Sequence, residues 1–123
     1  MTKRIFLGIS KRTYSLIIRE SETKNTVKYP AVTLESGNKH SVILTALFDS
    51  LRKLEKNDTA IFYPNDSLVS FEWETEHKKD GHFSKKTKDL ELWNKIVEIC
   101  ELKKINLTIK DSNDILSALG KYK

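Results

Sequence analysis

The sequence has only one cysteine, two prolines and four glycines among its 123 residues. A lone cysteine, Cys100, can form no internal disulfide and cannot supply a cysteine-based zinc site. No apolar run approaches the roughly 20 residues that span a membrane, and the first residues lack the apolar stretch of a signal peptide. Together with a length that suits one core, these absences predict a single domain over residues 1–123 in the cytoplasm.

The positive charge of the chain gathers near its start. The net charge is +5, and the first 30 residues hold seven Lys/Arg against two Glu, whereas the remainder of the chain balances. A basic edge of this kind attracts phosphate groups. A lysine-rich surface that serves only solubility has the same composition, so both interpretations stay open.

Three short apolar segments at the start predict three consecutive antiparallel strands. They are Ile5–Ile9, Tyr14–Ile18 and a third strand over residues 26–34. The separators between them are short and polar, as in hairpin loops. Pro30 lacks an N–H, so it bends the third strand or confines it to an edge of the sheet.

The apolar period then lengthens to that of helices. From Ser41 to Leu54, apolar residues recur every three or four positions, which predicts a helix with one buried face. The continuous apolar run Thr59–Tyr63 predicts a central strand, parallel to the first through a right-handed crossover. Asp66 or Ser67 then caps the next helix.

The second half of the chain predicts a basic loop, two helices and one strand. Residues 77–86 show no periodicity and form the loop, and a helix starts at Thr87 with Asp89 in its first turn. Residues 105–109 alternate as a strand with one exposed face, and Asp114 caps a short final helix. Core positions on the inner helices are expected for Trp73, Trp93 and Cys100.

Several stretches of the chain, in this order, resemble ribonuclease H. "IFLGIS" is similar to the opening strand of that family, and "KLEKNDTAIFYPNDSLV" is similar to its helix end, central strand and following turn. "WETEHKKDGHFSKKTKDLELWNKI" resembles its basic loop and the helix after it. The resemblance covers nearly the whole chain. It implies an α/β fold of the ribonuclease H type, in which three antiparallel strands and then parallel strands form a five-stranded mixed sheet with helices on both faces.

The same resemblance implies four carboxylates around two divalent cations, which activate a water for hydrolysis. This chain departs from that pattern at the first two places. The first carboxylate falls on Gly8, or on Leu7 or Ile9 with a small shift, and the second falls on Ile43 or Leu44. None of these residues binds a metal.

Two aspartates are left for the other two places. The third carboxylate falls on Asn65, or on Asp66 with a one-residue slip, and Asp114 fits the fourth. Each aspartate also suits the N-cap of a helix, a role that needs no metal, and we favour the N-cap over the metal ligand for both. Since two carboxylates do not readily hold a pair of cations, we expect a catalytically degenerate domain with no metal or other cofactor. Mg or Mn would be needed only by a nuclease with rearranged carboxylates.

The basic loop is the best candidate for contact with nucleic acid. In the ribonucleases H that the chain resembles, this region is a basic protrusion that grips the hybrid duplex. Glutamates just before the loop dilute its positive field, so an ordinary solvated loop is the alternative, and the three histidines fit no zinc motif. The predicted nucleic-acid-binding residues are Lys78, Lys79, Lys85, Lys86 and Lys88 in this region and Lys11 and Arg12 in the first hairpin.

Three functional hypotheses follow. The first is a non-catalytic ribonuclease H-like module that binds an RNA–DNA hybrid, another duplex or a nucleic-acid-handling protein, as an accessory protein of a phage or mobile element. The second is a metal-dependent nuclease of the ribonuclease H type. The third is a protein–protein interaction module that inhibits a host factor through an exposed edge strand.

Overall fold

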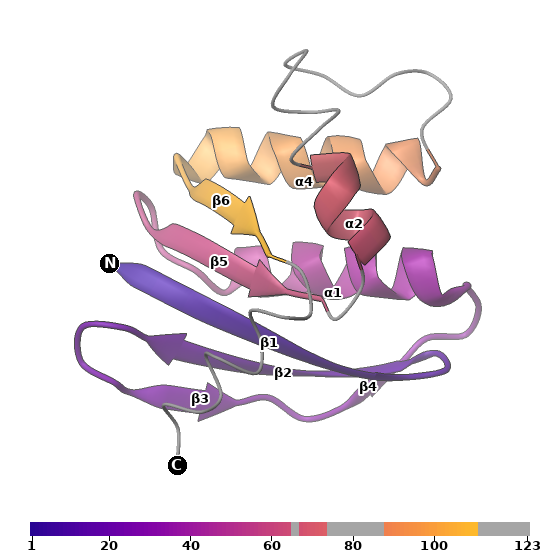
Figure 1. The fold of residues 1–123 in the computed structure, drawn as a ribbon, viewed down its shortest axis with the longest axis horizontal. Coiled ribbons are helices and arrows are strands. Elements are labelled where there is room, and N and C mark those ends of the chain that lie inside the picture. Colours follow the sequence, from indigo (N-terminus) through magenta and orange to yellow (C-terminus); the bar gives the residue numbers. More distant parts are fainter. Residues whose placement is uncertain (65–66, 74–87, 111–123) are drawn as a thin grey trace.

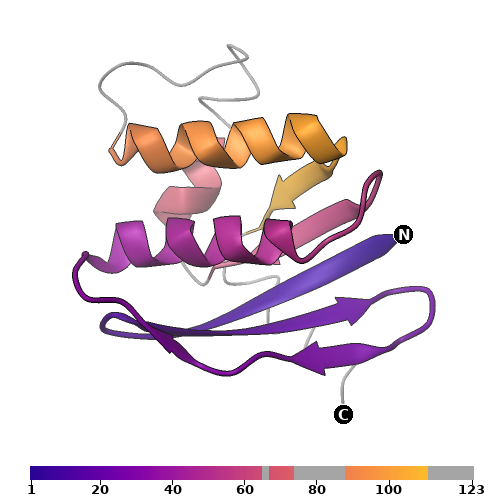
Figure 2. The same ribbon diagram turned by 180° about the vertical axis from the view of Figure 1, so that it is seen from behind.

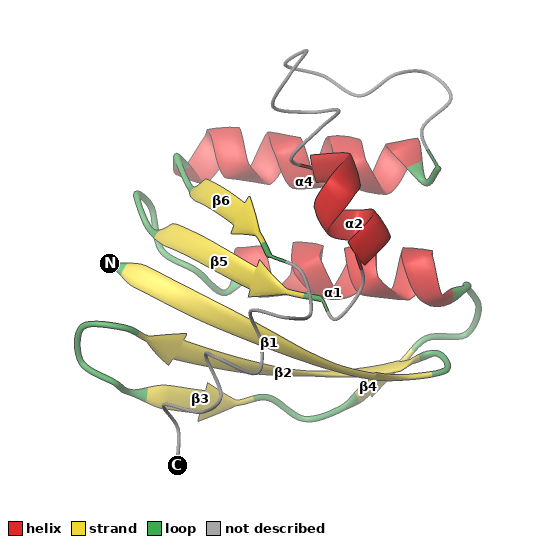
Figure 3. Cartoon of the chain, in the orientation of Figure 1, coloured by secondary structure: helices red, strands yellow, loops and turns green. Residues whose placement is uncertain are grey.

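The computed structural model describes residues 1–64, 67–73 and 88–110, which form a mixed sheet and a layer of helices (Figure 1). The helices and strands of Figure 3 follow the order expected from the sequence, except that the third strand is divided into two. The strands are β1 (Thr2–Ser10), β2 (Thr13–Glu20), β3 (Thr26–Lys28), β4 (Val32–Thr33), β5 (Thr59–Tyr63) and β6 (Asn106–Ile109), and the helices are α1 (Lys39–Arg52), α2 (Ser67–Phe71) and α4 (Leu90–Lys103).

The strand order in the sheet is β3-β2-β1-β5-β6, and β4 also pairs with β2. β1 and β2 are antiparallel, whereas β1 pairs with β5 and β5 with β6 in parallel. This topology confirms the expected mixed sheet and the central position of β5. The single third strand was wrong, because the chain pairs with β2 twice, as β3 and as β4, with Pro30 between them. Proline has no N–H to donate, so it interrupts the ladder.

The two long helices lie side by side over one face of the sheet (Figure 2). The predicted apolar stripe of α1 is confirmed, since Ile43, Leu47 and Leu51 are all fully buried. Along β1 the alternation sends Ile5 and Leu7 into the same core. The short final helix that the sequence predicts, over residues 114–120, lies outside the described residues.

Helix α2 closes the outer edge of β6. The Ser70 hydroxyl donates to the carbonyl of Ile109 at 2.9 Å, and the indole N–H of Trp73 donates to the carbonyl of Leu107 at 3.0 Å. These bonds satisfy carbonyls that would otherwise be open to another strand. Trp73 also stacks on Trp93 with ring centroids 5.8 Å apart. Both tryptophans are buried, as expected from the sequence.

Cys100 lies on the buried side of α4, as expected. Burial raises the pKa of its thiol to about 12, and the charge of Glu101 adds to the rise. A thiol with so high a pKa carries almost no thiolate near neutral pH and is chemically inert. Within the three described ranges, no helix is long and apolar enough to cross a membrane.

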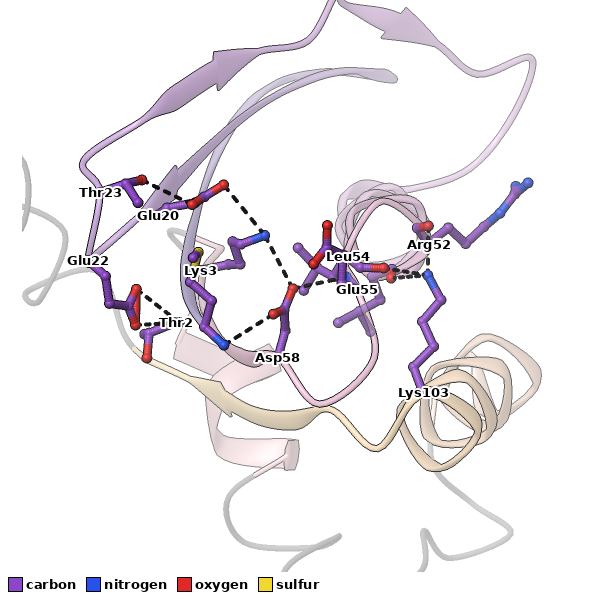
Figure 4. A network of polar contacts seen from close by, with 12 residues as sticks. Thr2, Lys3, Glu20, Glu22, Thr23, Arg52, Leu54, Glu55, Asp58 and Lys103 are labelled. Carbon is purple, nitrogen blue, oxygen red and sulfur yellow. Dashed lines mark hydrogen bonds and ion pairs between the residues drawn. The ribbon is translucent and has the colours of Figure 1, made fainter.

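A network of polar contacts lies where β1 begins and where α1 and α4 end (Figure 4). The ammonium group of Lys103, at the end of α4, donates to the carbonyls of Leu51, Arg52 and Leu54 at 3.2, 2.8 and 2.8 Å. A cation at this place adds a charged donor to carbonyls at and just after the end of α1, and it complements the negative end of the dipole of α1.

Replacing Lys103 by methionine should therefore lower the free energy of unfolding by about 1–2 kcal/mol, because several carbonyls lose one charged donor. Urea denaturation at neutral pH measures the change. Lys95→Met is the matched control, since Lys95 is exposed on the same helix. Equal midpoints for the two variants would contradict this role of Lys103.

Candidate nucleic-acid interface

Two of the positions that the resemblance assigns to metal-binding carboxylates can be inspected directly. Gly8 is exposed in β1 opposite Ser15, and a Cβ at Gly8 would lie 2.8 Å from the Ser15 hydroxyl. Ile43 and Leu44 belong to α1 and are fully buried in the core. These residues offer a cation no oxygen from a side chain, so they do not fit a two-cation centre. Asn65, Asp66 and Asp114 lie outside the described residues.

No other group of side chains takes over this role in the described part of the chain. There, no cluster of three or more His, Cys, Asp or Glu residues has a geometry that could hold a metal ion. The chemistry that this region offers is instead that of cations and backbone N–H groups.

A cavity of about 400 Å³ opens beside the β1–β2 turn. Its lining residues are Ile9, Lys11, Arg12, Gly37 and Lys39, and we call this cavity the basic pocket. The three cations come from the hairpin turn and from the first residue of α1. None of the described lining residues is acidic. The structure thus brings the predicted pair Lys11 and Arg12 together with Lys39, which the sequence analysis did not single out.

Backbone geometry holds the two sides of the basic pocket together. Arg12 donates through Nη1 to the carbonyl of Glu35, and the carbonyl of Arg12 accepts from the N–H of Leu34 at 2.9 Å. Lys11 takes a left-handed conformation with φ of 54°, which makes the tight turn between β1 and β2. These bonds fix the hairpin against the segment that leads into α1.

The start of α1 adds a positive end of a helix dipole to the basic pocket. The side chain of Asn38 caps the helix by accepting from the N–H of Ser41 at 3.0 Å. Gly37 precedes it with φ of 128°, and a Cβ there would lie 2.7 Å from the Ser41 hydroxyl. A side chain at this position would be strained and crowded, so glycine lets the backbone enter the helix at this angle.

His40, which follows the pocket residue Lys39 in the chain, contacts residues next to two other helices. Its Nδ1 lies 2.6 Å from a carboxylate oxygen of Asp89, just before α4, and its Nε2 lies 2.6 Å from an oxygen of Glu72, which follows α2. The other oxygen of Glu72 accepts from the indole N–H of Trp93 at 3.2 Å. We call His40, Glu72 and Asp89 the histidine clamp. His40 and Glu72 are each only 6% exposed.

The pKa of His40 reflects opposing influences. Burial lowers it, but the hydrogen bonds and negative charges of Glu72 and Asp89 outweigh burial, so the pKa lies above the ordinary value of 6.5. The sequence analysis missed the histidine clamp. Its one available signal was the position of His40, three, four and seven residues before the buried Ile43, Leu44 and Leu47.

The clamp also corrects the expected start of α4. The helix begins at Leu90 rather than Thr87, and Asp89 has φ of 55° with its carboxylate turned to His40 instead of capping the helix. Thr87 lies outside the described residues. The contact with His40 in α1 explains why the Asp89 carboxylate does not cap α4. The local sequence around Asp89 gives no sign of this contact.

Lys88 is the last predicted nucleic-acid-binding residue that the structure describes. It is exposed and adjoins Asp89, which bonds to the start of α1. The β1–β2 turn, the start of α1 and the start of α4 lie at one end of the molecule in both ribbon views (Figures 1 and 2). The other predicted lysines, Lys78, Lys79, Lys85 and Lys86, lie outside the described residues.

Comparison with known proteins gives similarity of structure only. No protein-family model matches the chain, and no curated protein matches its sequence. A structure of the foamy viral protease-reverse transcriptase in complex with an RNA/DNA hybrid is similar with a TM-score of 0.60 and 12% identity. The match covers 90% of this chain but only 17% of that one. The solution structure of the PFV RNase H domain matches with a TM-score of 0.49 and 13% identity over 90% of this chain and 78% of that domain.

Proposed function

Starting from the ribonuclease H-like fold that the structural similarity shows, we propose that this chain binds the phosphate backbone of nucleic acid at the basic pocket and does not hydrolyse it. The observation that carries the proposal is the convergence of Lys11, Arg12 and Lys39 on one cavity without an acidic residue in its described lining. The proposed partner is an RNA–DNA hybrid or a similar duplex, and the solved protein of similar fold was captured with such a hybrid.

The basic pocket suits phosphate for three physical reasons. Lysine and arginine make charge-assisted hydrogen bonds with phosphate oxygens, and their binding releases counterions from the nucleic acid. The N-terminal end of α1, capped by Asn38, adds the positive end of a helix dipole. Contacts of this kind position a backbone and carry no sequence information, so the binding should not depend on base sequence.

The residues at the first two positions that ribonuclease H would fill with carboxylates support the absence of hydrolysis. Hydrolysis by two cations needs several carboxylates at fixed distances. Gly8 has no side chain and Ile43 and Leu44 are buried hydrocarbon. A non-catalytic binding role of this kind suits an accessory protein of a phage or mobile element, which acts by occupying a nucleic acid or the machinery on it.

Binding can be tested with a labelled RNA–DNA hybrid of about 20 base pairs over a salt series. The logarithm of the association constant should fall linearly with the logarithm of salt, by about 0.9 for each phosphate contact, and hybrids of unrelated sequence should give the same slope. Lack of binding at low salt would reject the proposal and favour the protein interaction module.

Hydrolysis is tested on the same hybrid with Mg or Mn. We expect no cleavage by the wild-type chain. Cleavage that Asp66→Asn abolishes would show a working nuclease with rearranged carboxylates, and the non-catalytic proposal would then be wrong.

A further inference from the structure

The histidine clamp links three helices through one imidazole ring. Its bonds run from α1 to the residue after α2 and to the residue before α4, at 2.6 Å in each direction. We propose that protonation of His40 is a switch that fastens α2 and the start of α4 to the start of α1. A second consequence, which depends on the proposed function, is that the switch regulates affinity for nucleic acid.

With Glu72 and Asp89 both ionised, the doubly protonated ring is the form of His40 that satisfies both contacts. Both partners of His40 are carboxylate oxygens, and an ionised carboxylate only accepts hydrogen bonds. A neutral imidazole has a single N–H, so one of its nitrogens would present a lone pair to a carboxylate oxygen. In the imidazolium form both nitrogens donate, and one positive charge lies between two negative charges.

The charged groups around the ring can be named element by element for the described residues. Glu72 directly follows α2 and Asp89 directly precedes α4, and both contact the ring. On its own helix the neighbour of His40 is Lys39, and Lys88 adjoins Asp89. Both lysines are exposed, whereas His40 and Glu72 are buried. The carboxylates therefore dominate the surroundings of the ring, because water screens the lysines.

Loss of the proton leaves one of the two carboxylates, Glu72 or Asp89, facing a lone pair of the ring. A charge that loses its hydrogen-bond donor in this way is costly, and local separation of the elements relieves it. Helix α2 is the element that yields first, since a helix of five residues is not stable without tertiary contacts. The stabilisation from a raised pKa is fully present below the unfolded value of about 6.5, and it is lost as pH rises through the folded value.

The contact between His40 and Asp89 joins the segments that contain Lys39 and Lys88, which are far apart in the sequence. Opening the clamp releases the segment with Lys88 from the start of α1, where Lys39 lines the basic pocket. A cation contact to phosphate is then lost or loosened. We therefore expect weaker binding of the hybrid above the transition, by about 3- to 10-fold at 0.1 M salt for roughly one contact.

Tryptophan fluorescence reports the clamp without any ligand. The chain has two tryptophans, which stack on each other, and Trp93 donates to Glu72. A pH titration from 5 to 9 of the His77→Gln, His82→Gln variant, in which His40 is the only histidine, should show one transition above pH 6.5. The NMR signals of the His40 ring should titrate at the same midpoint.

Two further variants decide the outcome. His40→Gln should abolish the fluorescence transition, and Asp89→Asn should move it to lower pH, because the ring loses one of its two negative partners. Asp89 is at the rim of the clamp, so its variant keeps the test informative even where His40→Gln fails to fold. A midpoint at or below 6.5, or a transition that persists in His40→Gln, would overturn the switch.

Binding measured on the same variants separates the two parts of the inference. Affinity that follows the fluorescence midpoint, and loses its pH dependence in His40→Gln, supports regulation of the basic pocket. Affinity that does not change at the fluorescence midpoint would overturn the regulation of binding but not the protonation switch itself. A chain that binds no hybrid at any pH refutes the proposed function, and fluorescence still decides on the switch.

Discussion

Replacing Asp58 by alanine is expected to lower the free energy of unfolding by about 3–5 kcal/mol, because it removes the nearer and more buried of the two carboxylates that face the buried ammonium group of Lys3. Asp58 is only 2% exposed and lies 3.3 Å from the amine of Lys3, which is 8% exposed (Figure 4). The carboxylate of Asp58 also accepts from the N–H of Glu55 at 2.9 Å. Urea denaturation followed by circular dichroism measures the loss.

Two controls separate pairing of Lys3 from general damage. Glu20 also faces Lys3, at 3.9 Å, but its side chain is 28% exposed, so Glu20→Gln should cost less than about 1 kcal/mol. The double variant Lys3→Met, Asp58→Leu should be more stable than Asp58→Ala alone, since it buries no unpaired charge. The prediction fails if Asp58→Ala costs no more than Glu20→Gln.

In Asp58→Ala, the free energy of unfolding should also depend less on pH in the acid range. Burial by itself raises the pKa of Asp58, but the N–H of Glu55 and the charge of Lys3 outweigh it, and the pKa lies below the ordinary 3.8. A depressed pKa contributes stability above the unfolded value, and that stability is lost as pH falls through the folded value. As pH falls from above 3.8 through the lowered pKa of Asp58, the wild type should lose stability, whereas Asp58→Ala should lose less.

The elements that the sequence predicted best are those whose signal is local. The apolar stripe of α1 was predicted from its periodicity and the strand Thr59–Tyr63 from a continuous apolar run, and both signals lie within the segment that forms the element. The break of the third strand was harder to foresee. Pro30 announced a bend, but only pairing with β2 on both sides of it shows that two strands result.

The site was predictable only in part, because its residues meet through tertiary contacts. Charge near the start of the chain indicated Lys11 and Arg12, yet nothing linked them to Lys39 before the hairpin was seen against α1. His40 was considered only among histidines that might bind a metal. Its partners lie 32 and 49 residues away, a separation that no pattern within a single helix encodes.

Removing the three cations of the basic pocket is expected to weaken hybrid binding on the order of 100-fold at low salt, if each contact contributes about 1 kcal/mol. The variant is Lys11→Gln, Arg12→Gln, Lys39→Gln. Its salt slope should be shallower than that of wild type by about 2–3, because each lost phosphate contact removes close to one unit. Fluorescence anisotropy with a labelled hybrid between 50 and 200 mM salt measures both quantities.

A control of equal charge distinguishes the pocket from net charge. Lys56, Lys95 and Lys104 are exposed and are not part of the described pocket lining, so their triple replacement by glutamine lowers the net charge equally. This control should change the slope by much less than the pocket variant does. Arg12 also ties the hairpin to Glu35, so thermal unfolding must first show that the pocket variant is folded. Equal losses in the two variants would mean that binding follows overall charge, and the basic pocket would then have no special role.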